Sequence, residues 1–195
     1  MSPVQYIVTI CWAIFCLYWL VSARSVKSTR QTKGWLAGNW HSIWLLLGGL
    51  FLSNVPFLAK VGVPVSSLTI LLIPHSIVIN AVIIVFAVTG LTVAMIARRT
   101  LGGNWSRAVA FKENHQLITT GLYHYVRHPI YTGILLLVLG TVLSVGTLSA
   151  GIGFVIIVLG IGFKLRAEEA LLTQHFPKEY PPYKNRTKAL IPYIV

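Results

Sequence analysis

Long apolar runs alternate with short basic stretches along this chain, and the pattern predicts a helical membrane protein. Three runs are each near the length of about 20 residues that one helix needs to cross a bilayer: 3–23, 43–59 and 76–97. A further uncharged run, 129–163, is too long for one span, and its centre, rich in glycine and serine, favours a turn. We therefore expect a hairpin of two helices at about 129–145 and 149–174. The sequence predicts an all-α integral membrane protein with five transmembrane helices.

Two further features of the apolar regions carry expectations about packing. Residues 60–74 contain an apolar piece too short to cross a bilayer, so we expect a surface-lying or re-entrant segment on the outer side. His75 and Asn80 are expected to bond to neighbouring helices rather than to line a polar path. Four glycines of the last predicted helix are expected to permit close helix contact: Gly151, Gly153, Gly160 and Gly162.

Basic residues are concentrated in three of the connections, and this bias predicts which side of the membrane each connection faces. Residues 24–33 hold four Lys and Arg, residues 98–127 hold five and residues 164–188 hold six, and Lys60 is the sixteenth. Cytoplasmic loops of membrane proteins carry an excess of positive charge. Five spans with the N-terminus outside and the C-terminus in the cytoplasm place fifteen of the sixteen on the cytoplasmic side.

Composition narrows the classes of protein further. The 195 residues are 55% hydrophobic and carry a formal net charge of +12. This hydrophobicity excludes a soluble globular domain. Membrane topology explains the positive charge, so nucleic acid is not an expected partner. Cys11, Cys16 and the histidines have no metal-ligand spacing, so we expect small buried thiols and no metal.

Residues 115–133, HQLITTGLYHYVRHPIYTG, concentrate side chains suited to chemistry just before the predicted hairpin. A proline pushes the residue before it away from the helical conformation, so His128 is predicted to be extended. Pro129 suits the first position of a helix, where no amide donor is needed. The start of a helix carries unpaired N–H groups and the positive end of the helix dipole. With Arg127 beside it, this helix start is predicted to seat an anion at the membrane surface.

Half of the four acidic residues form the adjacent pair Glu168 and Glu169, where the last helix leaves the membrane. A solvated helix face with Arg166 and Glu169 paired at i, i+3 is one interpretation. We favour a functional one, because carboxylates close to a membrane are usually functional. Carboxylates suit an ammonium, a ribose diol or a sulfonium, whereas the helix start with Arg127 suits a carboxylate. One small molecule, S-adenosylmethionine, carries all of these groups.

Together these residues carry a resemblance to a known family. The chain resembles the isoprenylcysteine carboxyl methyltransferases, and their phospholipid methyltransferase relatives, over about residues 101–192. The motif RHPIYTG at 127–133 with the downstream Glu-Glu is the specific part of the likeness, and Leu122 stands where relatives often have proline. The other matching positions are Gly121, Tyr123, Phe176, Tyr180, Tyr183 and Arg186. Eukaryotic members carry more spans, so this chain resembles a minimal, prokaryotic version in a cell membrane.

The resemblance implies a cytoplasmic pocket for S-adenosylmethionine, with S-adenosylhomocysteine as product. Residues 98–195 would form the catalytic region, and residues 1–97 would supply three N-terminal spans. The residues implied to bind the cofactor are His115, Gln116, Leu117, Ile118, Tyr123, His128, Pro129, Ile130 and Tyr131. The residues implied to be catalytic are Arg166, Glu168, Glu169 and Arg127. Among these, Arg166 and Glu168 would face the substrate, Glu169 would be second in line, and Arg127 would hold a carboxylate.

The activity implied by the resemblance is methylation of the C-terminal carboxylate of a prenylated cysteine or a similar lipidated acid. A carboxylate has a reference pKa of about 3.5, so it is ionised near neutral pH and needs no general base. The protein then has to align the reactants and exclude water. Methylation of a lipid amine on the same scaffold, a sterol-type reductase and a non-catalytic membrane scaffold are the alternatives. The expected partners are the bilayer and a lipid substrate.

Overall fold

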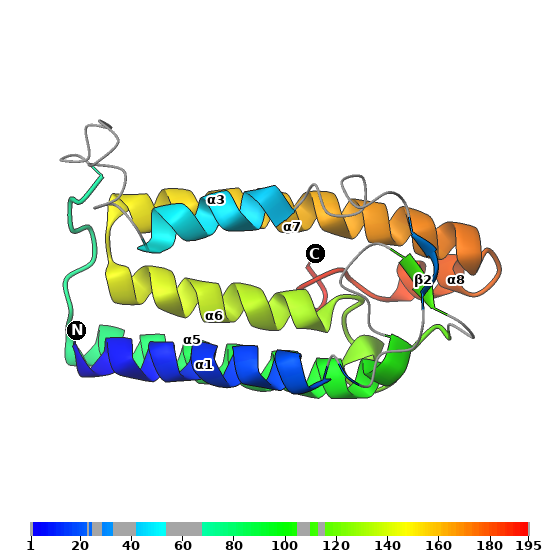
Figure 1. Ribbon diagram of the computed structural model, residues 1–195, viewed down its shortest axis with the longest axis horizontal. Coiled ribbons are helices and arrows are strands. Elements are labelled where there is room, and N and C mark those ends of the chain that lie inside the picture. The colour runs from blue at the N-terminus through cyan, green and yellow to red at the C-terminus, as the bar shows by residue number, and fades with distance from the viewer. Residues whose placement is uncertain are drawn as a thin grey trace.

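The computed structural model describes residues 2–22, 24, 29–32, 42–53, 68–104, 110–112 and 116–194. Within these residues, Figure 1 shows five helices side by side: α1 (Pro3–Ser22), α3 (Ser42–Ser53), α5 (Ile77–Leu101), α6 (Pro129–Val145) and α7 (Leu148–His175). Smaller elements lie together at one end: the helix α8 (Tyr180–Arg186), the antiparallel strands β1 (Thr29–Thr32) and β2 (Ala110–Lys112), and the 3-10 turns η2 (Gly102–Asn104) and η3 (Gly121–His124). The predicted helical architecture is confirmed, with one small sheet added.

The lengths of the helices decide which of them are candidate membrane spans. Among the described residues, α1, α5 and α7 are long and apolar enough to cross a membrane, in agreement with an integral membrane protein. The apolar helix α6 has 17 residues, which at a rise of 1.5 Å per residue is about 25 Å. The helix α3 has 12 residues, and the rest of the predicted second span, 43–59, lies outside the described residues. Five spans and their orientation stay predictions.

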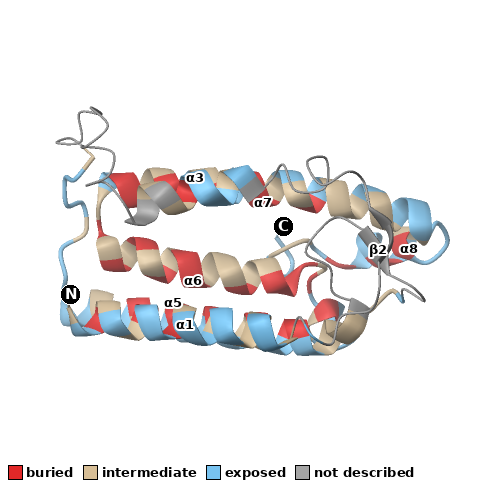
Figure 2. Ribbon diagram, viewed as in Figure 1, coloured by how far each residue is buried: buried red, intermediate tan, exposed pale blue. Residues whose placement is uncertain are grey.

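Burial is concentrated where the helices face one another, and the outward side of α1 is exposed (Figure 2). A core cluster joins α1, α5 and α6 and includes Val8, Ile83 and Leu137. The outward side of α1 carries exposed leucine and isoleucine side chains, which is typical of a lipid-facing surface. Cys11 is buried as expected, whereas Cys16 is exposed, so the expectation of a buried thiol is wrong there. Cys16 lies on the part of α1 that turns away from this core.

Helices α5 and α6 approach each other closely at Gly90 and Gly133. A Cβ atom on Gly90 would lie 2.5 Å from the backbone nitrogen of Leu137, and one on Gly133 would lie 2.5 Å from that of Ala94. Real Cβ atoms essentially never show such short contacts, so this helix crossing requires glycine at both positions. Gly133 of the RHPIYTG motif is therefore a packing residue that fixes α6 against α5.

Replacing Gly133 by valine is expected to lower the thermal unfolding temperature of the detergent-solubilised protein. Overpacking a helix contact typically costs about 1–3 kcal/mol, and here the obstructing atoms belong to backbone as well as to side chains. Gly151→Val is the matched control on α7, because a Cβ there meets nothing within 4 Å. Circular dichroism during heating measures both. Equal unfolding temperatures for the two variants would contradict the packing role.

Helix α3 lies on α7, and this contact tests the expectation for the four glycines of α7. Gly160 packs against α3 where a Cβ would clash with Trp44, and the Gly153 backbone also lies against α3. The expectation of close helix contact is confirmed for these two glycines. It is wrong for Gly151 and Gly162 as far as the described residues go, because a Cβ at either meets nothing within 4 Å.

The described part of the connection before α5 lies over the turn between α6 and α7. The Leu72 amide donates to the Gly146 carbonyl at 2.8 Å. Gly146 ends α6 with a φ of 71°, a left-handed conformation that favours glycine. Residues 68–73 thus cover one end of the bundle, while the rest of the predicted surface-lying or re-entrant segment is outside the described residues. Within the part of the chain that the structure describes, the side chains of His75 and Asn80 bond to each other at 3.1 Å rather than to neighbouring helices.

At the opposite end of the bundle, hydrogen bonds tie the helix ends together. Arg98 is 2% exposed and donates at 2.7 Å both to the Ser22 carbonyl at the end of α1 and to the Gly102 carbonyl after α5. The Tyr183 hydroxyl of α8 donates to the Tyr123 carbonyl of η3 at 2.6 Å. Burial raises the pKa of Tyr183 to about 12, although nearby arginines partly offset it. This hydroxyl therefore stays protonated near neutral pH and remains a donor.

Candidate functional site

Helix α6 begins at the proline of the RHPIYTG motif. Pro129 occupies the start of the helix, as predicted, and His128 is its N-cap. The extended conformation predicted for His128 is wrong, because its φ is −129° and its ψ is 56°. Both sides of its backbone are held by tertiary structure and helix: the His128 amide donates to the Ala189 carbonyl at 3.0 Å, and its carbonyl accepts from the Thr132 amide at 3.2 Å.

The C-terminal segment pairs with the backbone just before α6. The amides of Arg127 and His128 donate to the carbonyl oxygens of Lys188 and Ala189 at 2.8 and 3.0 Å. The Thr132 hydroxyl adds a bond of 2.7 Å to the carbonyl of the next residue in the same segment. Amide donors beside the predicted anion seat are thus used by the chain itself. The anion seat at the start of α6 stays a prediction.

Glu169 is the centre of an ion cluster that joins three parts of the chain. Arg127 donates from Nε to a Glu169 oxygen at 2.8 Å, and the Lys184 ammonium lies 2.7 Å from the other oxygen. His128 Nε2 lies 3.4 Å from the first oxygen. Arg127 also donates to the carbonyls of Lys184 and Thr187. Glu169 therefore binds partners far away in sequence, not Arg166 one turn earlier on the same helix.

Glu168, the adjacent carboxylate, has a different environment. It accepts a hydrogen bond of 2.7 Å from the Tyr131 hydroxyl. His128 Nδ1 lies 3.8 Å from it and the Lys164 ammonium 4.0 Å. Its side chain is 23% exposed, against 13% for Glu169. The predicted meeting of the start of α6 with the glutamate pair is confirmed as geometry, whereas the chemical roles of these residues stay predictions.

Lys164 belongs to this cluster and escaped the sequence-based selection. Its side chain is 13% exposed, and its ammonium lies 5.5 Å from the centre of the Tyr131 ring. The signal available in the sequence was its spacing of four residues from Glu168, which places both on one face of a helix. A lysine at the end of an apolar run is also a usual marker of membrane topology, so its position alone gave no reason to predict Lys164 as a site residue.

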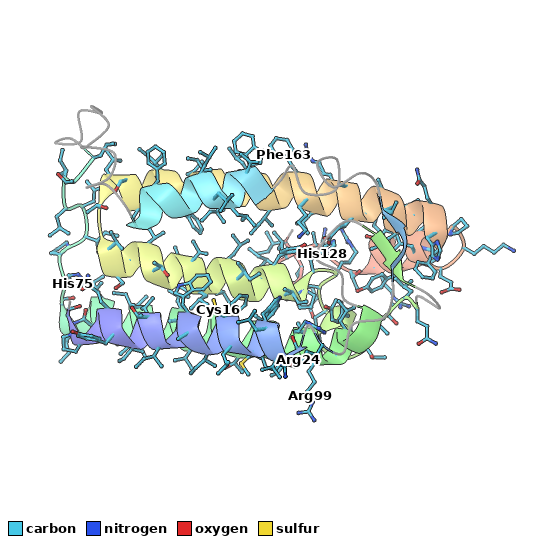
Figure 3. All side chains as sticks on the ribbon, viewed as in Figure 1. Cys16, Arg24, His75, Arg99, His128 and Phe163 are labelled. Atoms are coloured by element: carbon cyan, nitrogen blue, oxygen red, sulfur yellow. The ribbon has the colours of Figure 1, made fainter. Side chains whose placement is uncertain are left out.

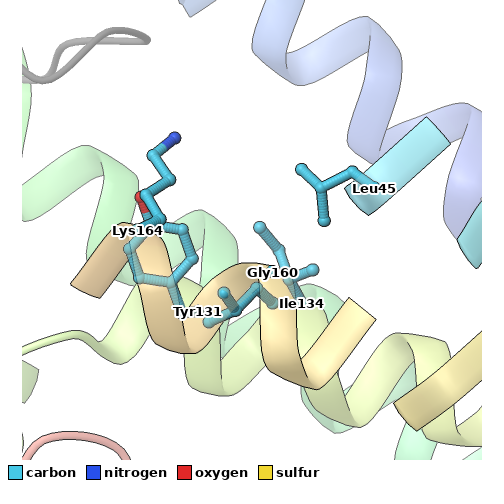
Figure 4. A pocket seen from close by; sticks show the side chains of 6 residues that line it. Leu45, Tyr131, Ile134, Gly160 and Lys164 are labelled. Carbon is cyan, nitrogen blue, oxygen red and sulfur yellow. The ribbon is translucent and has the colours of Figure 1, made fainter. Parts of the chain in front are cut away.

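An apolar recess leads away from Lys164 between α3, α6 and α7 (Figure 4). The residues that line it are Leu45, Tyr131, Ile134, Gly160, Ile161 and Lys164. Its enclosed volume is about 30 Å³, far smaller than that of pockets for drug-sized ligands. The recess suits a hydrocarbon segment better than a whole nucleoside, so the predicted cofactor pocket stays a prediction.

The remaining residues predicted to hold the cofactor fall into several groups. Tyr123, Pro129 and Ile130 are buried, and Ile118 packs against the first and last of these. Figure 3 shows His128 in the space between α6 and α7, at the end of the bundle where α8 lies. The others are Leu117, which is half-buried, Gln116, which is exposed, and His115, which lies outside the described residues.

Arg166 is separated from the cluster. It is exposed on α7, two residues after Lys164 and two before Glu168. Two residues correspond to about 200° around a helix, so Arg166 faces away from both. The structure therefore brings together five of the predicted site residues, Arg127, His128, Tyr131, Glu168 and Glu169, with Lys164, and leaves Arg166 outside.

Comparisons with known proteins cover the same region. Residues 78–174 match the isoprenylcysteine carboxyl methyltransferase family. Proteins named protein-S-isoprenylcysteine O-methyltransferase are similar: those of Schizosaccharomyces pombe (34% identical over 96 residues), Saccharomyces cerevisiae (35% over 102) and Rattus norvegicus (28% over 120). The alignments cover 48%, 51% and 60% of this chain, and 41%, 43% and 42% of the relatives. The chain thus spans less than half the length of these three relatives. They are eukaryotic, and the prokaryotic origin expected from its small size stays a prediction.

Proposed function

We propose that this chain, which belongs to the isoprenylcysteine carboxyl methyltransferase family through residues 78–174, transfers a methyl group from S-adenosylmethionine to a carboxylate. The substrate is the C-terminal carboxylate of a prenylated cysteine or a similar lipidated acid at the membrane surface. The hydrogen bond of 2.7 Å between Tyr131 and Glu168 carries the proposal. It joins the family motif at the start of α6 to the glutamate pair on α7, and both lie inside the matched region.

The donor set at this junction fits the cofactor. Glu168 is a carboxylate that stays partly open to solvent while Tyr131 fixes one of its oxygens. Such an oxygen suits the ammonium or the ribose diol of S-adenosylmethionine. Glu168, His128 and Tyr131 would hold this molecule. When bound, it supplies a methyl group on a positively charged sulfur.

The protein's own contribution is alignment and exclusion of water. A carboxylate substrate is already ionised near neutral pH, so no residue needs to remove a proton. The Glu169 cluster fixes Arg127 and His128 beside Glu168, which keeps the site in one geometry. Arg127 is thus a positioning residue, because its guanidinium is engaged by Glu169 and by two carbonyls. We therefore expect a cation other than Arg127 to bind the substrate carboxylate.

The apolar recess between α3, α6 and α7 supports lateral entry of a lipid tail. Its lining is hydrocarbon, because Lys164 and Tyr131 contribute only carbon atoms to it. The Lys164 ammonium and the Tyr131 hydroxyl lie beyond this lining, at 4.0 Å and 2.7 Å from Glu168. A tail in the recess therefore brings the head of a lipid to Glu168. In the predicted topology, with five spans and the C-terminus in the cytoplasm, this site faces the cytoplasm.

The lipid tail is expected to contribute strongly to kcat/KM. Each buried CH₂ group contributes about 0.8 kcal/mol, so a tail that buries as few as about four carbons in the recess corresponds to about a 200-fold loss when it is removed. Comparing a farnesyl-thioether acid with its methyl-thioether analogue, with radiolabelled S-adenosylmethionine in detergent, measures this. Equal kcat/KM for the two acids would rule out entry through the recess.

Methylation of a phospholipid amine is the second candidate, and Glu168 is the observation that favours it. An amine nucleophile has to lose a proton at some stage, and a partly exposed carboxylate near the acceptor is able to take it. The position of the radiolabel separates the two activities. A base-labile ester indicates carboxyl methylation, and label in base-stable lipid indicates methylation of an amine.

A further inference from the structure

We infer that Lys164 selects the headgroup of the lipid substrate, binding a carboxylate and disfavouring an ammonium. This selection presupposes the proposed methyltransferase function. The inference names the residue that makes the site prefer a lipidated acid to a lipid amine, whereas the rest of the site suits both substrates.

The position of Lys164 supports this role. Its stem lines the apolar recess together with Tyr131 and Gly160 (Figure 4). Its ammonium lies outside this apolar lining, 4.0 Å from Glu168. A lipid whose tail occupies the recess therefore presents its head to this ammonium. Lys164 is the charged residue among the six that line the recess.

The other cations of the site have different tasks. Arg127 donates to Glu169 and to two carbonyls, and Lys184 lies 2.7 Å from Glu169. Arg166 is exposed on another face of α7. The Lys164 ammonium lies 4.0 Å from Glu168 and 5.5 Å from the centre of the Tyr131 ring. A carboxylate headgroup that arrives beside Glu168 adds a second negative partner for this ammonium.

A purely structural role is the competing explanation. Lysine and glutamate four residues apart on a helix often form a pair on the surface. Lys164, however, is 13% exposed, and its stem is covered by apolar groups. Charged side chains in such surroundings are kept mostly where function needs them. An incoming ammonium headgroup would meet a like charge here, and that repulsion is a means of specificity.

The variant Lys164→Met tests the inference, because methionine keeps an unbranched stem and removes the charge. Binding of a farnesyl-thioether carboxylic acid, its primary amide and the matching primary amine is measured by calorimetry in detergent. The wild-type protein is expected to bind the acid at least about tenfold more tightly than the amide, and the amine most weakly. In Lys164→Met the acid and the amide are expected to bind within about twofold of each other, and Lys164→Arg is expected to restore the preference.

Lys178→Met is the matched control, because Lys178 is exposed after α7 and its loss changes the net charge equally. It is expected to keep the preference of the wild-type protein. Circular dichroism during heating checks that each variant is folded. If Lys164→Met does not fold, Lys164→Gln takes its place. A preference for the acid that survives removal of the charge overturns the inference.

Turnover measured beside binding separates this inference from the proposed function. If the acid binds selectively through Lys164 but is never methylated, the proposed function fails and the headgroup selection stands. If Lys164→Met methylates the acid with unchanged KM and still prefers it to the amide, the selection fails and the proposed function stands. A rise in KM of at least about tenfold with kcat within threefold supports both.

Discussion

Replacing Glu168 by glutamine is expected to lower kcat/KM for a lipidated acid by at least about a hundredfold while the protein stays folded and inserted. Glutamine has nearly the same shape, and its carbonyl oxygen still accepts the hydrogen bond from Tyr131. What disappears is the negative charge beside the proposed position of the cofactor. Removing one preorganised electrostatic contact from an active site typically costs a factor of about 10²–10³. Radiolabel transfer from S-adenosylmethionine measures the loss.

Glu179→Gln is the control for this prediction, because Glu179 is an exposed acid at the start of α8 and undergoes the same chemical change. It is expected to keep turnover within about twofold of the wild-type protein. Titration with S-adenosylhomocysteine then shows whether Glu168→Gln affects binding or the chemical step. Near-normal turnover in Glu168→Gln would mean that Glu168 is not a site residue.

The second large effect concerns the ion cluster around Glu169. The side chains of Arg127 and Glu169 are 9% and 13% exposed, and they meet at 2.8 Å. Removing one partner of a buried pair leaves an uncompensated charge and typically costs about 3–5 kcal/mol. Arg127→Gln and Glu169→Gln are therefore each expected to lower the free energy of unfolding by about that much. Both are also expected to lose turnover, because His128 loses its fixed neighbours.

The double variant Arg127→Gln/Glu169→Gln distinguishes a coupled pair from two independent residues. It is expected to be clearly more stable than the sum of the two single losses predicts, because no charge of the pair is left alone. Unfolding in mixed micelles provides the free energies. Lys184→Gln serves as a milder reference, because this lysine is 47% exposed and its pair with Glu169 is partly screened. Additive losses would show that Arg127 and Glu169 act separately.

The helical hairpin shows how much of the fold local sequence signals determine. We predicted helices at about 129–145 and 149–174, and the structure has Pro129–Val145 and Leu148–His175. Local chemistry explains this agreement. A proline begins the first helix, Gly146 ends it in a left-handed conformation, and the Thr147 hydroxyl caps the second.

The strands β1 and β2 and the C-terminal pairing could not be predicted in this way. Thr29–Thr32 and Ala110–Lys112 are short, and they pair across about 80 residues of chain. Neither has an alternation of apolar and polar residues that marks a strand. The parallel bridge between Val126 and Lys188 likewise joins residues that are distant in sequence. Such pairings depend on how the packed helices position the segments that follow them, and a local sequence pattern gives no information about that.

The contacts of the candidate site were likewise predictable only in part from the sequence. The contact of Tyr131 with Glu168 followed from placing a helix start and a helix end on the same side of the membrane. The partner of Glu169 did not follow, because the local i, i+3 rule pointed to Arg166, whereas the tertiary fold brings Arg127 to it. A rule that applies within one helix gives no information about contacts with the segment that precedes α6.

The carbonyls of residues 188–190 accept hydrogen bonds from two backbone amides and the Thr132 hydroxyl around the start of α6. During synthesis a ribosome delivers α6 to the bilayer well before these residues emerge. The helix α6 thus reaches the membrane first, and the segment that pairs with its motif arrives later. A nascent chain in the membrane therefore passes through an interval without an assembled site.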